Sequence, residues 1–227
     1  MTKPTDKSMS SWDNAIATPK TQRELKRRAL LRVAGRIFNE KGYYGTSLDE
    51  IADALGVTKP ALYYYVKSKD ALLYECLMLS YGCGQRARLY AEEHGGTAYE
   101  KLQLLYKTFM VLLMEERGAY TTMANIAALP EKQQKDLMER RRQLDRYSRT
   151  LIRQAIDEGA IRPVDVRVTS NFLLGAVNWI LRWYSEDEYA PEEIAAIFLD
   201  LMMNGIAVNR ADILSLLGGS APKPSKA

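Results

Sequence analysis

The stretch from Ser47 to Tyr65 reads SLDEIADALGVTKPALYYY, and it decides the fold. Ser47 is followed three residues later by Glu50, which is the pattern of a capping box at the start of a helix. Thr58 stands before a second apolar run and Pro60 falls in its first turn, where proline favours a helix start. The sequence therefore predicts two short helices in close succession.

The separation of these two helices is typical of a helix-turn-helix. Two helices that cross at a steep angle over a tight turn need a small residue at the crossing, and Ala52 supplies it. They also need a residue free to turn, Gly56, and an apolar anchor on the second helix, Leu62. All three stand at the required separations, so we expect a helix-turn-helix here.

Helical periodicity extends on both sides of this unit. Apolar residues at three- and four-residue spacing predict helices over 21–41, 68–93, 98–114, 131–158, 165–184 and 191–209, and no strand alternation is found. We therefore expect an all-α protein of about nine helices. Its predicted parts are a tail (1–19), a three-helix domain carrying the helix-turn-helix (20–67), a larger helical domain (68–210) and a second tail (211–227).

Charge is unevenly divided along the chain. Residues 20–69 carry eleven Lys and Arg against five Asp and Glu, whereas residues 70–227 carry nineteen against twenty-one. A basic first domain joined to a slightly acidic second one fits a protein that binds the phosphate backbone of DNA. Small helical domains often have basic faces, however, so this balance supports DNA binding only together with the motif.

The second short helix exposes residues suited to a DNA major groove. Three successive tyrosines span most of a helix circumference, so they cannot all be buried. Lysine can donate to a guanine edge, an alanine methyl can contact a thymine methyl, and tyrosine hydroxyls can donate to phosphates. The DNA-binding residues predicted on this basis, and from the resemblance given next, are Ser47, Thr58, Lys59, Pro60, Ala61, Tyr63, Tyr64, Tyr65 and Lys69.

About fifty residues carry a resemblance to a known family. The runs ALLRVAGRIF (29–38), GYYGT (42–46), SLDEIA (47–52), LGV (55–57), KPALYYYV (59–66) and KDALL (69–73) resemble the amino-terminal domain of the tetracycline-repressor-like (TetR) family. The resemblance implies an all-α dimer, an effector-binding core and repression relieved by a small ligand. By position in the motif it implies that Ser47 and Lys69 hold phosphates, that Tyr64 is a further candidate, and that the residues touching DNA are Lys59, Pro60, Ala61, Tyr63 and Tyr65.

One position departs from the pattern of some family members. Asp49 stands where they carry a basic residue that reads bases, and a carboxylate cannot bind a phosphate oxygen. We therefore expect specificity to depend on the second helix and on the basic segment of Lys20, Arg23, Lys26 and Arg27.

An aromatic and methionine-rich stripe follows in the larger domain. It is either plain hydrophobic core or the lining of a cavity for an apolar effector, and the sequence does not separate the two. The candidate ligand-binding residues of this stripe are Tyr106, Phe109, Met110, Met114, Tyr120 and Met123.

The run NWILRWY (178–184) offers a second candidate ligand site. Asn178 and Arg182 share one helical face, and Trp179 and Trp183 share the next. One interpretation is a dimer face formed by the last two helices. The other adds Arg182, with Arg146 or Arg149, as a clamp for an anionic ligand. The run resembles that of TetR-family regulators that respond to acyl-coenzyme A thioesters.

Other classes of site find little support. His94 is the single histidine and lies beside two glycines, which favours a surface turn over a catalytic base, so we expect no enzyme activity, metal or cofactor. Cys76 and Cys83 fall about 10 Å apart along one helix and cannot bridge, although a redox-sensing thiol stays an alternative. No leader or membrane span is recognisable, and the cytoplasm is the expected compartment.

The sequence thus predicts a transcriptional regulator with three kinds of partner. These are double-stranded operator DNA, a second copy of the chain bound through the last two helices, and a small-molecule effector such as an acyl-CoA thioester. A drug-sensing repressor that uses the methionine and aromatic stripe alone is the first alternative. A helical enzyme or scaffold with a basic domain is the second.

Overall fold

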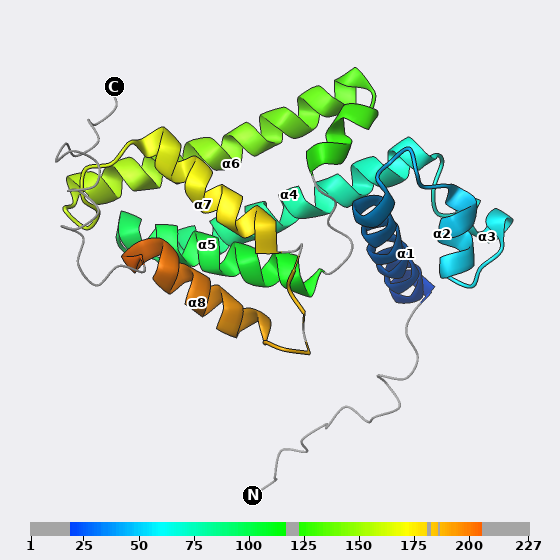
Figure 1. Ribbon diagram of the computed structural model, residues 1–227, viewed down its shortest axis with the longest axis horizontal. Helices are drawn as coiled ribbons and strands as arrows, with labels where there is room; N and C mark the ends of the chain where they lie inside the picture. Colours follow the sequence, from blue (N-terminus) through cyan, green and yellow to red (C-terminus); the bar gives the residue numbers. More distant parts are fainter. Residues whose placement is uncertain (1–18, 117–122, 181–182, 186, 206–227) are drawn as a thin grey trace, which may run out of the picture.

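The described part of the chain folds into a series of helices. The computed structural model describes residues 19–116, 123–180, 183–185 and 187–205 (Figure 1). Within these ranges the backbone forms eight α-helices and one short 3-10 helix, η1. The elements are α1 (Pro19–Lys41), α2 (Leu48–Ala54), α3 (Lys59–Tyr63), α4 (Lys69–His94), α5 (Ala98–Glu115), η1 (Met123–Ala128), α6 (Glu131–Asp157), α7 (Val166–Ile180) and α8 (Pro191–Asn204).

The all-α prediction is confirmed, and most predicted helices lie within a few residues of those observed. Gly42 ends α1 at a φ of 72°, with its N–H bonded to the Phe38 carbonyl at 3.0 Å. α8 stops earlier than predicted, because Gly205 takes a φ of 74° after Asn204. Apart from residue 19, both predicted tails lie outside the described residues.

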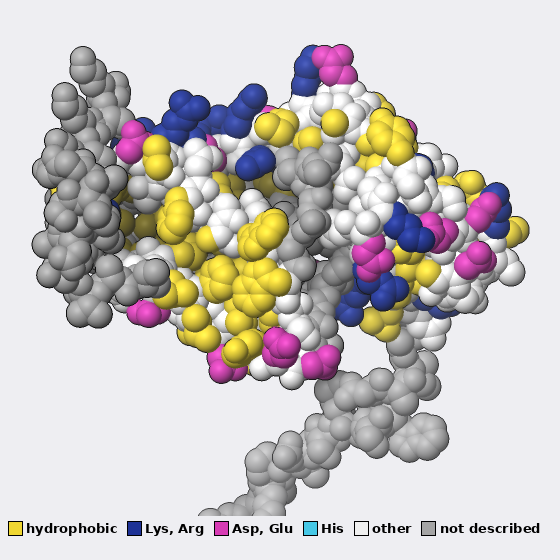
Figure 2. Space-filling model, viewed as in Figure 1, with side chains coloured by type: hydrophobic (Ala, Val, Ile, Leu, Met, Phe, Trp, Pro, Cys, Tyr) yellow, Lys and Arg dark blue, Asp and Glu magenta, His cyan; other side chains and the backbone are white. Residues whose placement is uncertain are grey.

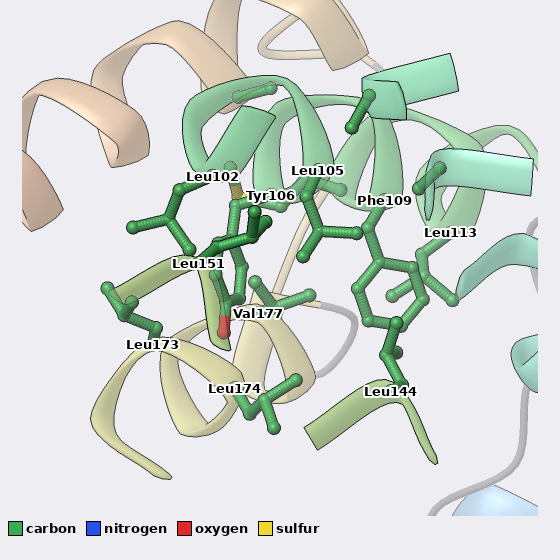
Figure 3. Close-up of a cluster of buried hydrophobic side chains, with 14 of the residues drawn as sticks. Leu102, Leu105, Tyr106, Phe109, Leu113, Leu144, Leu151, Leu173, Leu174 and Val177 are labelled. Carbon is green, nitrogen blue, oxygen red and sulfur yellow. The ribbon is translucent and has the colours of Figure 1, made fainter. Parts of the chain in front are cut away.

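The buried side chains form two separate clusters. The first joins α1, α2, α3, η1 and the early turns of α4 and α6, with Phe38, Ile51 and Leu62 at its centre. The second joins the later turns of α4 to α5, α6, α7 and α8 around Tyr106 and Leu151 (Figure 3). The helix-turn-helix therefore sits on its own core, apart from the core of the larger domain.

Helix α4 connects the two clusters. Leu73 and Cys76 on its early turns lie in the first core, whereas Cys83 and Ala87 lie in the second. Figure 1 shows α1 to α3 at one end of the molecule and α5, α7 and α8 at the other, with α4 and α6 running between them. A displacement of α4 would therefore move residues in both hydrophobic cores. No helix in the described part of the chain is long and apolar enough to span a membrane.

Candidate DNA-binding site

The turn between α2 and α3 has the geometry that the sequence predicts. Gly56 takes a φ of 66°, a conformation that residues with a Cβ rarely adopt. The Val57 N–H then bonds to the Ala52 carbonyl at 3.0 Å, which closes the turn. Ala52 and Leu62 are almost fully buried where the two helices meet.

Both short helices begin at a side-chain cap. The Ser47 hydroxyl accepts from the Glu50 N–H at 3.1 Å, and the Thr58 hydroxyl accepts from the Ala61 N–H at 3.4 Å. The capping box predicted at Ser47 is only half formed, because the Glu50 carboxylate pairs with Lys41 from the end of α1. This ion pair links α2 to the end of α1. Helices α1 and α2 together form the platform on which α3 is held.

Helix α3 is shorter than the sequence suggests and ends at Tyr63. Its first turn presents Lys59, Pro60 and Ala61 to solvent. A helix N-terminus that exposes these residues is the part that enters a major groove in helix-turn-helix proteins. Thr58 is also exposed, at the N-cap.

The three tyrosines divide as their crowding on a short helix predicts. Tyr63 and Tyr64 are 47% and 69% exposed, whereas Tyr65 is half-buried against the first core. Tyr64 packs edge-on against Tyr65 and lies beneath the guanidinium of Arg23, 5.6 Å from the ring centroid. Tyr63 and Tyr64 are thus presented for contact, while Tyr65 mainly supports them.

Lys69 has a partner set that the sequence did not reveal. Its ammonium donates to the backbone carbonyls of Tyr43 at 2.9 Å and Thr46 at 2.8 Å, and it lies 4.1 Å from the centroid of the Tyr43 ring. The amine therefore stabilises the turn between α1 and α2. Its contact with a phosphate stays a prediction, as does that of Ser47.

The two charged residues at the front of the motif are joined to each other. The Lys59 ammonium lies 2.8 Å from one carboxylate oxygen of Asp49 and 2.9 Å from the other. The hydrogen bond to Asp49 raises the pKa of Lys59. Asp49, from which specificity was expected to shift to the second helix, thus lies directly beside the predicted base-reading lysine.

The basic segment at the start of α1 is only partly available. Arg27 forms an ion pair with Glu75 of α4 at 2.9 Å, and Arg23 covers Tyr64. Lys26 is exposed, and the side chain of Lys20 lies outside the described residues. We therefore expect Lys26 and Arg23 to contribute most to backbone contacts on this side of α3.

The candidate ligand residues on α5 lie in the second core. Tyr106, Phe109, Met110 and Met114 are each at most 4% exposed, and Figure 3 shows Tyr106 and Phe109 among the packed leucines. In this state they are core, which was one of the two interpretations, and an effector role stays a prediction. Tyr120 and the side chain of Met123 lie outside the described residues.

The predicted anion clamp is not assembled among the described residues. Arg146 pairs with Glu139 at 2.7 Å, and Arg149 pairs with Asp145 at 2.6 Å. Arg182 lies outside the described residues, so its relation to them is not defined. A ligand phosphate would have to compete with the carboxylates for Arg146 and Arg149.

The remaining described residues of the second candidate site, Asn178, Trp179 and Trp183, do not lie in one environment. Asn178 is half-buried and Trp179 is 63% exposed. Trp183 folds back and stacks on Phe198 of α8, with ring centroids 5.8 Å apart. The two tryptophans therefore do not form one face, because Trp183 packs on α8 while Trp179 faces solvent.

Burial governs the chemistry of both cysteines. Cys76 and Cys83 are free thiols, and burial raises the pKa of each. A raised pKa lowers the fraction of reactive thiolate at neutral pH. Within the described residues, no group of three or more His, Cys, Asp or Glu could hold a metal ion.

Two capped helices crossing over a glycine turn, with an exposed lysine and tyrosines on the second, define a helix-turn-helix DNA-binding protein. The family model "Bacterial regulatory proteins, tetR family" matches residues 30–76, and "Tetracyclin repressor-like, C-terminal domain" matches residues 95–206. The chain belongs to the TetR family of transcriptional regulators. It is a DNA-binding regulator and not an enzyme.

Relatives and solved structures agree over most of the chain. The HTH-type transcriptional repressor KstR2 of Mycolicibacterium smegmatis is 26% identical over 196 residues, covering 82% of this chain and 93% of KstR2. The TetR family regulator PfmR of Thermus thermophilus superposes with a TM-score of 0.67 at 29% identity, covering 78% of this chain and 98% of PfmR. AibR, solved with isovaleryl coenzyme A and operator DNA, gives 0.64 at 26% identity, covering 78% and 98%.

Proposed function

We propose that this regulator is a homodimeric repressor that releases its operator when an acyl-CoA thioester binds to the larger domain. The likeness to AibR carries the effector class, because it extends over 98% of that chain and AibR was solved with isovaleryl coenzyme A and operator DNA. Repression follows the printed description of KstR2. The exposed first turn of α3 supplies the contact with DNA.

An apolar face on α7 and α8 supports the homodimer. Val168, Phe172 and Trp179 form one stripe along α7, and Ile197 and Leu201 lie one helical turn apart on α8; all five are more than 40% exposed. Figure 2 shows hydrophobic side chains gathered over these two helices. A contiguous apolar patch of this kind marks a protein interface. A second copy would bury it and place two α3 helices on one DNA duplex.

Substitutions on this face test the dimer. Phe172→Asp and Ile197→Asp should each give monomers in analytical ultracentrifugation, because an unpaired carboxylate would be buried in the interface. The same variants should weaken operator binding, since monomers lose the gain from linked half-sites. Leu89→Asp, on the exposed face of α4, is the control and should remain dimeric. Persistent dimers in both interface variants would refute this surface.

Contacts between α4 and α6 provide a route from the effector domain to the DNA-binding domain. The Tyr74 hydroxyl donates to the Asp136 carboxylate at 2.6 Å, and Arg140 pairs with the same carboxylate at 2.7 Å. Because Tyr74 lies beside the first core, a shift of α6 would be carried through α4 to the helix-turn-helix. The two α3 helices of a dimer would then no longer match successive major grooves.

Calorimetry tests the effector class directly. Isovaleryl-CoA and a long-chain acyl-CoA should each release heat on titration and displace the regulator from DNA upstream of its own gene, whereas free coenzyme A should bind more weakly. Absence of heat with every thioester, combined with displacement by apolar drugs, would favour the drug-sensing alternative. If that DNA gives no shift in a gel, displacement is measured on an operator selected from randomised duplexes.

One pair of variants tests the arginine clamp. Arg146→Ala should weaken thioester binding about tenfold if its guanidinium binds a ligand phosphate. Arg153→Ala removes an exposed arginine from the same helix and should leave thioester binding unchanged. Equal thioester affinities of the two variants would show that Arg146 does not bind the ligand. The proposed effector class would not be affected by that result.

A further inference from the structure

The ion pair between Asp49 and Lys59 bridges the two helices of the helix-turn-helix at its exposed front. Lys59 is the first residue of α3, and Asp49 lies in the first turn of α2. The ammonium reaches both carboxylate oxygens, at 2.8 Å and 2.9 Å, while the side chains remain 56% and 60% exposed. The two groups therefore present a donor and an acceptor side by side to whatever approaches α3.

Stability does not account for this pair. An ion pair with more than half of each side chain in solvent contributes little to folding, because water screens it and two long side chains lose freedom. A carboxylate on this surface also opposes the phosphate backbone, so it lowers the affinity for DNA of any sequence. The Asp49 carboxylate thus increases the share of the DNA affinity that must come from contacts with base pairs.

The donor and acceptor match a G·C pair best. In the major groove a G·C pair offers the guanine N7 and O6 acceptors beside the cytosine N4 amino donor. Lysine donates to guanine and aspartate accepts from the cytosine amino group, and these are the pairings that the two side chains favour. An A·T pair also presents acceptors and one amino donor, but it lacks the adjacent N7 and O6 acceptors that lysine favours and the cytosine amino group that a carboxylate favours.

We propose that Asp49 and Lys59 read one G·C pair of each half-site as a unit, with Asp49 as the specificity-determining residue. The pair is formed before DNA arrives, so Lys59 is already held at the base edge instead of sampling nearby phosphates. The inference rests on the DNA-binding function of the family. It revises the expectation that specificity depends on the second helix and the basic segment without Asp49.

Selection from a pool of randomised DNA duplexes with the full chain tests the proposal. The parent should enrich a half-site with a defined G·C pair. Asp49→Ala should enrich the same half-site with that one pair relaxed, and its preference for G·C over A·T there should fall about tenfold. Asp49→Asn should move the preference toward A·T, because an amide pairs with adenine at N6 and N7.

A charge-matched control separates base reading from simple electrostatics. Asp53→Asn removes one negative charge from an exposed position of the same helix. Both Asp53→Asn and Asp49→Asn should bind non-operator duplex more tightly than the parent, but only Asp49→Asn should change the selected sequence. Lys59→Met should relax the same base pair, and combining it with Asp49→Ala should cause little further loss there.

The outcomes distinguish the proposal from the function on which it rests. If the parent enriches no sequence, DNA reading itself fails. If the parent enriches a half-site and Asp49→Ala enriches it without change, Asp49 is not a specificity determinant. Circular dichroism spectra identical to that of the parent would show that the variants remain folded.

Discussion

Asn125 fastens η1 to the end of α1 by donating from its side-chain amide to the Phe38 carbonyl at 3.2 Å. Its carbonyl oxygen accepts from the Tyr43 N–H at 3.1 Å, just beyond the end of α1. The side chain is 8% exposed, so water cannot replace these partners fully. One asparagine therefore holds the segment between α5 and α6 against the platform of the helix-turn-helix.

We expect Asn125→Ala to lower the free energy of unfolding by about 2 kcal/mol, because buried backbone groups lose their partners. Denaturant unfolding at one fixed protein concentration measures this, since dimerisation makes stability concentration-dependent. Gln143→Ala, at an exposed position on α6, is the control and should change it little. Equal unfolding curves for the Asn125 variant and the parent would contradict the assignment.

Lys69 leads to a second prediction, in which stability and DNA binding separate. Lys69→Met removes a charged donor from the carbonyls of Tyr43 and Thr46, so we expect the free energy of unfolding to fall by about 2 kcal/mol. The predicted phosphate contact is tested separately, because a salt dependence of DNA affinity equal to that of the parent would refute it. A slope shallower by about one ion would show instead that Lys69 contacts a phosphate. Lys67→Met removes an exposed lysine nearby as the control.

Local signals explain why the helices could be predicted from the sequence. Caps such as Ser47 and Thr58 and stops such as Gly42 act within a few residues of the backbone that they fix. The same locality made the helix-turn-helix recognisable, because its small residue, turn glycine and anchor all lie within eleven residues of one another.

The contacts of the site depend on how distant helices meet, which no local signal records. Glu50 satisfied the capping-box pattern, yet its carboxylate pairs with Lys41 because α1 ends beside α2. Asp49 and Lys59 meet only because the two helices cross steeply at the turn. Asn125 follows a segment with no recognisable motif, and its partners are more than eighty residues away in sequence.

Two glycines provide a matched pair of opposite predictions. Gly56 takes a φ of 66°, and an added Cβ there meets nothing within 4 Å, so the cost of Gly56→Ala is backbone strain of about 1–2 kcal/mol. Gly82 lies inside α4 with equally open space, and Gly82→Ala should stabilise the protein by about 1 kcal/mol. Thermal unfolding of the two variants beside the parent should therefore show shifts of opposite sign. Shifts of the same sign would refute the distinction.

The buried hydroxyl of Tyr106 predicts how stability depends on alkaline pH. The hydroxyl lies 2.8 Å from the Ser148 hydroxyl, and burial raises the pKa of Tyr106 far above its ordinary value of 10.0. In the unfolded chain this tyrosine ionises near pH 10, whereas in the folded protein it stays protonated. Its contribution is therefore complete below pH 10, and the free energy of unfolding falls as the pH rises above that value.

Replacing Tyr106 should remove the contribution of one titrating proton from the pH dependence of the free energy of unfolding. Between about pH 10 and 11 the parent should lose up to about 1.4 kcal/mol per pH unit through Tyr106 alone. Tyr106→Phe should be less stable at neutral pH, yet its alkaline loss should be shallower by that amount. Tyr44→Phe, which removes an exposed hydroxyl, serves as the control. Denaturant unfolding at several alkaline pH values measures both slopes, and parallel curves for Tyr106→Phe and the parent would show that this hydroxyl ionises equally in the two states.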